Sequence, residues 1–126
     1  KLNEWLSQVM GQFPDYKIAI EETHHLQKLD KPSGTAITLA EDIINTHPHY
    51  RRWALDASKE KDVKIASFRQ AEVAGKHVIN YHSPIDTLAI THEAHSRKGF
   101  ALGAVLVAEW IQDKKGIFTM NDFIKI

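Results

Sequence analysis

The sequence contains no cysteine, which excludes disulfide scaffolds, thiolate nucleophiles and cysteine zinc sites. It also lacks a net charge, because 16 Lys and Arg residues balance 16 Asp and Glu residues, whereas general nucleic-acid binders usually carry a basic excess. No apolar run approaches the roughly 20 residues that a membrane-spanning helix needs. The absence of cysteine is compatible with a reducing cytoplasm.

Glycine is scarce, and its six residues form neither a G-x-G-x-x-G motif nor a P-loop. The chain therefore carries no nucleotide-binding fingerprint of its own. Its 126 residues suffice for one domain with a real core. The first residue is not Met and the opening residues already have a helical pattern, so we expect the chain to be a piece of a longer protein.

Hydrophobic periodicity predicts the elements of the fold. Apolar residues recur at helical spacing in three segments, 2–10, 36–44 and 100–111. They alternate with polar residues in four predicted strands, 16–22, 63–69, 77–82 and 85–92. We expect the last two strands to pair as a hairpin and residues 49–61 to be irregular. This order indicates an α+β fold with a mixed, mostly antiparallel four-stranded sheet and helices on one face.

The stretch from His24 to Ala36 is the most informative part of the sequence. Two imidazoles, His24 and His25, and the amine of Lys28 stand just ahead of a Pro-Ser-Gly-Thr turn, and a helical pattern follows directly. A helix start offers free backbone N–H groups and the positive end of a dipole. The combination favours binding of an anionic small molecule and proton transfer to it.

Electrostatics couples such a ligand to its proton donor. An unperturbed imidazole titrates close to neutrality, a nearby ammonium lowers its pKa, and a bound carboxylate raises it. A ligand with two carboxylates could therefore help to charge the imidazole that protonates it. The plainer alternative is one packed and one exposed histidine, followed by an ordinary helix cap in which Ser33 or Thr35 accepts from the first turn.

Several charged residues could support this site. Glu21, Glu22 and Asp30 could orient the nearby imidazole or amine, and the sequence does not choose among them. Arg69 at the end of a strand and Arg97 at a strand-to-helix junction suit bidentate carboxylate binding. Their alternative is a surface salt bridge of little energetic value.

The remaining histidines raise the question of a metal. The possible ligand pairs are His47 with His49 and His92 with His95. Zinc normally takes three or four well-placed ligands, and neither pair supplies them. We therefore expect no metal, and the sequence leaves the roles of these four histidines and of Arg69 open.

Residues 22–36 read E-T-H-H-L-Q-K-L-D-K-P-S-G-T-A and resemble the signature of the 4-hydroxy-tetrahydrodipicolinate reductase (dihydrodipicolinate reductase) family. Further matches are Arg69, residues 75–78 and residues 92–104. Two positions depart from the usual alanine, Thr23 and Lys31. The resemblance implies that His24 is the general acid that protonates the ring carbon beside the one taking hydride, and that Lys28 is the catalytic amine assisting it. It implies substrate-binding roles for five residues, His25, Ser33, Gly34, Thr35 and Arg97.

The resemblance further implies a cytoplasmic two-domain homotetramer that acts in lysine and diaminopimelate synthesis. A Rossmann domain outside this chain would bind NADH or NADPH, so no cofactor-binding residue is expected here and the chain alone should be inactive. Residues 1–98 would form the substrate-binding and oligomerisation domain, with tetramer contacts through the sheet, and residues 99–126 a helix and tail that pack on the Rossmann domain. The alternatives are a stand-alone anion-binding or oligomerisation module without catalysis, and another Rossmann-linked oxidoreductase.

Overall fold

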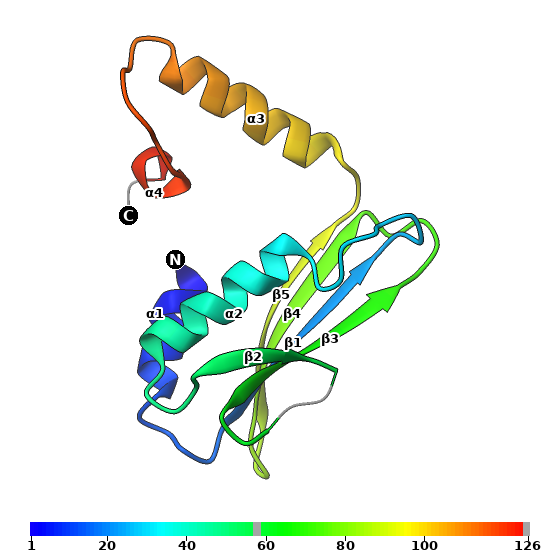
Figure 1. The fold of residues 1–126 in the computed structure, drawn as a ribbon, viewed down its shortest axis with the longest axis vertical. Coiled ribbons are helices and arrows are strands. Elements are labelled where there is room, and N and C mark those ends of the chain that lie inside the picture. The colour runs from blue at the N-terminus through cyan, green and yellow to red at the C-terminus, as the bar shows by residue number, and fades with distance from the viewer. Residues whose placement is uncertain (57–58, 125–126) are drawn as a thin grey trace. The chain divides into compact units, whose positions relative to one another are not determined.

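The computed structural model describes residues 1–56 and 59–124 and divides the chain into two compact units, Lys1–His95 and Ser96–Ile126. The first unit contains α1 (Leu2–Met10), β1 (Lys17–His24), α2 (Gly34–Thr46), β2 (Arg52–Leu55), β3 (Asp62–Arg69), β4 (Gly75–His82) and β5 (Thr87–Ala94) (Figure 1). The second contains α3 (Lys98–Ile111) and α4 (Met120–Phe123). None of the described helices is long and apolar enough to cross a membrane.

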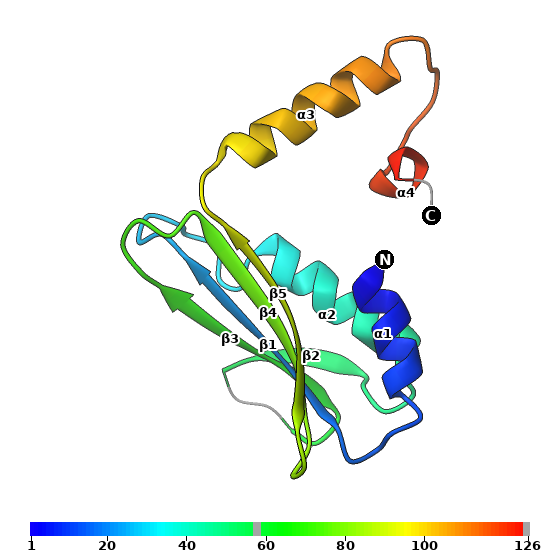
Figure 2. The same cartoon turned by 180° about the vertical axis from the view of Figure 1, so that it is seen from behind.

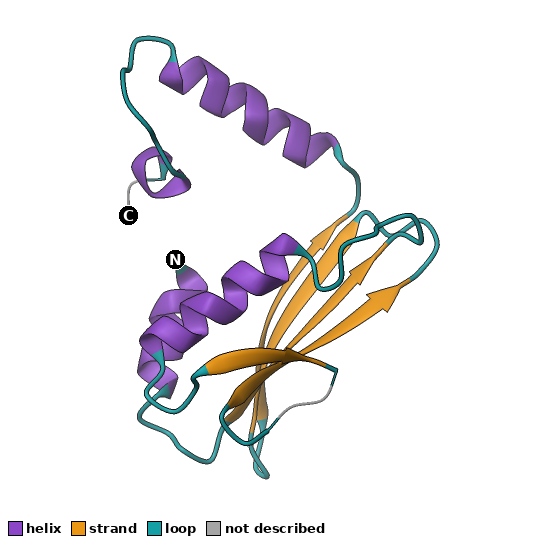
Figure 3. Ribbon diagram, in the orientation of Figure 1, coloured by secondary structure: helices purple, strands orange, loops and turns teal. Residues whose placement is uncertain are grey.

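The strands of the first unit form one mixed sheet in the order β2-β3-β1-β4-β5 (Figure 3). β3 runs parallel to both β1 and β2, whereas β4 is antiparallel to both β1 and β5. The α+β class is confirmed, and the predicted hairpin is β4–β5. The sheet has five strands rather than four, and parallel and antiparallel pairings balance.

The additional strand, β2, lies inside the segment that was predicted to be irregular. It has only four residues, too few for an alternation of apolar and polar side chains to stand out. Its conformation comes from tertiary pairing, in which Trp53 lies opposite Val63 and Leu55 opposite Ile65 of β3. β2 is therefore a strand because it pairs with the buried strand β3, and its own residues do not predict this conformation.

Both helices of the first unit lie on the same side of the sheet in the two opposite views of Figures 1 and 2. α2 packs on β1, β2 and β3, and α1 packs on α2. The buried apolar residues between these layers are Met10, Ile18, Ile20, Ala36, Ala40, Ile43, Tyr50, Val63, Ile65, Ile79 and Tyr81. The prediction of helices on one face is therefore confirmed for this unit.

The buried face of β1 continues from the apolar core into a cluster of polar side chains. Side chains two residues apart point to the same side of a sheet, so Ile18, Ile20, Glu22 and His24 share the helix-covered face of β1. All four are buried. The first two join the apolar core and the last two extend it at the carboxyl end of the strand, which positions the candidate site.

The second unit consists of α3 and a short returning segment. No residue of α3 is buried, although its composition is strongly apolar. Within this unit, Trp110 makes edge-on contacts with Phe118 and Phe123, each with ring centroids 5.5 Å apart. Thr119 and Asp122 form a capping box at the start of α4.

Candidate functional site

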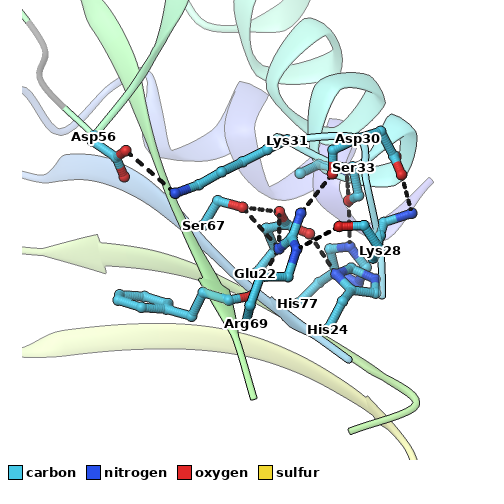
Figure 4. Close-up of polar contacts among 12 residues, drawn as sticks. Glu22, His24, Lys28, Asp30, Lys31, Ser33, Asp56, Ser67, Arg69 and His77 are labelled. Atoms are coloured by element: carbon cyan, nitrogen blue, oxygen red, sulfur yellow. Dashed lines mark hydrogen bonds and ion pairs between the residues drawn. The ribbon is translucent and has the colours of Figure 1, made fainter. Parts of the chain in front are cut away.

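A cluster of buried polar side chains lies where β1, β3 and β4 run side by side and the loop from β1 to α2 begins (Figure 4). Strand register explains the convergence. His24 lies opposite Arg69 of β3, and Glu22 lies opposite His77 of β4. Residues far apart in the sequence thus meet at the end of the central strand.

Glu22 is the fully buried centre of this cluster. Its Oε1 accepts hydrogen bonds from the Ser67 hydroxyl and from Arg69 Nη1, the latter at 3.1 Å. Burial by itself would raise the pKa of Glu22, but the hydrogen bonds from Ser67 and Arg69 outweigh it and lower the pKa. Glu22 is therefore a buried carboxylate held in its charged form.

His24 shares one side of this carboxylate. Its Nδ1 lies 2.5 Å from Glu22 Oε2, so Glu22 orients the imidazole and favours a proton on Nδ1. Burial lowers the pKa of His24, Glu22 opposes this shift, and the charges of Lys28 and Arg69 add to it, with a net lowering. Of the carboxylates that the sequence left open, Glu22 is the one placed on His24.

His77 is a member of the cluster that sequence reasoning did not single out. Its ring lies edge-on to that of His24 with centroids 5.0 Å apart, and its Nε2 lies 3.0 Å from Ser33 Oγ. Burial, followed by the charge of His24, lowers the pKa of His77 to about 4. The only signal in the sequence was its place in the short match at residues 75–78, together with strand alternation that puts it on the covered face.

The loop after β1 brings Lys28 to the cluster. Its Nζ pairs with Asp30 Oδ1 at 2.9 Å, and its ammonium lies close enough to contribute to the lowered pKa of His24. The guanidinium of Arg69 ties this loop to β3, because Nε donates to the carbonyl of Lys28 at 3.2 Å and Nη2 to that of Asp30 at 2.5 Å. The open question about Asp30 is also answered, since it pairs with the amine.

The start of α2 completes the site. Ser33 is the N-cap, with Oγ accepting from the amide of Ala36 at 3.2 Å, and the amide of Ile37 donates to the Ser33 carbonyl. The amides of Gly34 and Thr35 precede these bonds, and both residues are exposed. Apart from its chain neighbours and its own helix backbone, a β-carbon built on Gly34 would meet no described atom within 4 Å, so the space beside this helix start is open. Such a helix start can bind an anion.

The other two predicted site residues lie outside this hydrogen-bond network. His25 is half-buried, with Nδ1 3.2 Å from Gln27 Oε1. Arg97 is exposed at the N-terminus of α3, in the second unit. Their contacts with a substrate remain predictions.

Glu22, His24 and His77 bring three potential ligand atoms within 4.8 Å of one another. Arg69 already donates to Glu22, and the Lys28 ammonium adds further positive charge beside His24. Both charges oppose a cation. The arrangement fits an acid–base network better than a metal centre.

The chain is similar to known proteins over nearly its whole length. The family model described as dihydrodipicolinate reductase, C-terminus, matches residues 1–124. The chain belongs to this family. A 4-hydroxy-tetrahydrodipicolinate reductase of Christiangramia forsetii is 50% identical over 124 residues, which cover 98% of this chain and 52% of that protein. The reductase of Buchnera aphidicola from Schizaphis graminum is 36% identical over 129 residues, with coverages of 94% and 46%.

The family resemblance read from residues 22–36 is thereby confirmed. The chain spans about half the length of the curated relatives it matches. Among solved structures, a dipicolinate-bound dihydrodipicolinate reductase from Paenisporosarcina sp. TG-14 shares the fold, with a TM-score of 0.70 at 22% identity over 98% of this chain and 49% of that one.

Proposed function

We propose that this chain is the substrate-binding and catalytic part of an NAD(P)H-dependent reductase that converts 4-hydroxy-tetrahydrodipicolinate to tetrahydrodipicolinate in lysine and diaminopimelate synthesis. The single observation that carries the proposal is the convergence of an oriented imidazole, an amine and an open helix N-terminus at one end of β1. The names of the relatives and the dipicolinate in the fold neighbour supply the substrate class.

Each proposed group has a separate task. The exposed amides of Gly34 and Thr35 bind one carboxylate of the substrate at the positive end of α2. The Lys28 ammonium contacts a carboxylate and assists proton transfer, while His25, Ser33 and Arg97 make the remaining substrate contacts. Burial lowers the pKa of His24, and the charges of Lys28 and Arg69 lower it further. A dicarboxylate bound here offsets those charges and raises the pKa, which favours the protonated imidazole.

The reaction balances with one proton from this site. The substrate carries a 4-hydroxyl that the product lacks, so water leaves while one hydride and one proton add to the ring. NADH or NADPH, bound by a nucleotide-binding domain outside residues 1–126, would supply the hydride. Residues 1–126 do not distinguish between the two nucleotides. His24 supplies the proton to the ring carbon beside the one that takes the hydride. No metal takes part in this scheme.

The proposal extends to assembly and location. The outer strand β5 is exposed along most of its length, although it pairs fully with β4. An exposed sheet edge and face suit association with further copies of the chain, and we propose a cytoplasmic homotetramer formed through the sheet. Residues 99–126 would pack on the nucleotide-binding domain, which fits the unburied apolar residues of α3.

Kinetics of the full-length enzyme test the assignment. The double variant His24→Ala, Lys28→Ala should lose nearly all turnover and keep its affinity for NADPH, because both residues act on the substrate alone. Residues 1–126 by themselves should bind pyridine-2,6-dicarboxylate and reduce nothing. Wild-type turnover in the double variant would refute the residue roles, and failure to bind the dicarboxylate would favour a module of another kind.

A further inference from the structure

Arg69 is the residue that joins the two halves of the site. Its side chain is only 17% exposed, and its three nitrogens face different partners. Nη1 donates to Glu22 at 3.1 Å, to Ser67 Oγ at 3.1 Å and to the carbonyl of Phe68 at 2.7 Å, whereas Nε and Nη2 donate to the carbonyls of Lys28 and Asp30. All three nitrogens of the Arg69 guanidinium are therefore engaged in hydrogen bonds.

Two series of contacts lead from this guanidinium to the proposed acting groups, His24 and Lys28 (Figure 4). One runs through Glu22, whose second oxygen faces His24 Nδ1 at 2.5 Å. The other runs through main-chain carbonyls to the loop that carries Lys28. Apolar packing contributes little to holding that loop, because Leu26 and Leu29 are 62% and 95% exposed.

We propose that Arg69 is the positioning residue of this site: one guanidinium fixes the loop that presents Lys28 and, through the buried carboxylate of Glu22, the orientation of His24. The inference rests on the proposed function only in taking His24 and Lys28 as the acting groups. Arginine suits the task because its planar fork serves several acceptors at once, which a lysine ammonium on a flexible stem does not.

The pKa of His24 distinguishes this proposal from a simple loss of stability, because the charged groups around His24 shift that pKa in opposite directions. The groups that face it are Glu22 on the same strand, His77 on β4, Arg69 on β3 and Lys28 on the loop. Glu22 raises the pKa of His24 and Arg69 lowers it. Arg69→Gln should therefore raise that pKa, since Ser67 still donates to Glu22 and keeps it charged, whereas Glu22→Gln should lower it.

The test uses the full-length enzyme, with selectively 13C-labelled histidine to follow the His24 titration by NMR and pH profiles of kcat/KM. Arg69→Gln should move the His24 titration and the alkaline limb of the profile upward, and Glu22→Gln should move both downward. Arg69→Gln should also raise KM for the dicarboxylate about 10- to 100-fold, because a slight displacement of the Lys28 loop misplaces the amine. The affinity for the nucleotide should not change.

Two further variants separate charge from geometry. Arg69→Lys keeps a positive charge near Glu22 but cannot serve both loop carbonyls, so it should raise KM with little movement of the pH profile. Arg52→Gln is the matched control, because Arg52 also pairs with a carboxylate, that of Asp62 at 2.8 Å, but its side chain is 61% exposed on β2. It should leave both readouts unchanged.

The outcomes are distinct. Opposite shifts in Arg69→Gln and Glu22→Gln, with raised KM in both Arg69 variants, support the proposal. Circular dichroism first shows which variants keep the native fold. Among folded variants, a His24 titration that stays in place in both Arg69→Gln and Glu22→Gln, or that moves in the same direction in both, overturns the proposal. If the NMR titration shifts as expected while the pH–rate profile does not follow, the positioning role stands and the assignment of His24 as the acid fails.

Discussion

The buried imidazole of His77 makes the stability of the protein depend on pH in a calculable way. Burial and the neighbouring charge of His24 lower its pKa from 6.5 to about 4 in the folded state. Between these two values the unfolded chain binds a proton that the folded chain refuses, so stability rises with pH and is lost as pH falls below 6.5. Linkage then predicts that His77 alone costs about 2 kcal/mol of folding free energy between pH 7 and pH 5.

The variant His77→Gln isolates this contribution. Glutamine does not titrate, and its amide can still meet the Ser33 hydroxyl that lies 3.0 Å from His77 Nε2. Urea unfolding followed by tryptophan fluorescence at pH 7 and pH 5 should show a smaller loss of stability in the variant than in the wild type, by about 2 kcal/mol. The variant His82→Gln, at an exposed position on the same strand, should keep the wild-type loss.

An equal loss of stability in His77→Gln and the wild type would refute the reasoning. It would mean that His77 accepts a proton in the folded protein as readily as in the unfolded chain. The effect assigned to burial in this cluster would then be wrong, and with it the argument that burial lowers the pKa of the neighbouring His24.

Three further predictions concern the packing of the site and of the core. Gly75→Ala should reduce kcat, because the residue has φ +155° and its new β-carbon would lie 3.2 Å from His24 Nε2; kinetics with unchanged nucleotide affinity would show it, and full activity would contradict the close approach. Tyr50→Phe should cost about 1–3 kcal/mol in urea unfolding, since its hydroxyl accepts from the buried amide of Ile18 at 2.7 Å; a loss within error would show that water replaces it. Ile20→Ala should cost about 2–5 kcal/mol because Ile20 is fully buried in the core.

Periodicity predicted the long elements well and the short one not at all. The helix expected over 36–44 is the centre of α2, and the strand expected over 63–69 is β3, because each buries one face of a regular repeat. β2 escaped because its four residues form a strand through pairing with β3 rather than through a pattern of their own.

The sequence predicted where the site lies but not which of its side chains contact one another. Local order along residues 24–36 placed the histidines and Lys28 beside a helix start, and Ser33 is the N-cap that such a turn predicts. Which carboxylate serves which base depends on strand register, which pairs Glu22 with His77 and His24 with Arg69 across 40 or more positions of the chain. No local pattern reports that register, so His77 and the role of Arg69 came only from the structure.

The most direct test is a structure of the full-length enzyme with pyridine-2,6-dicarboxylate bound. We expect one carboxylate on the amides of Gly34 and Thr35, the other beside Lys28, and a ring carbon facing the imidazole of His24. A dicarboxylate seated elsewhere, with the start of α2 untouched, would contradict the claim that this end of β1 is where the substrate is protonated.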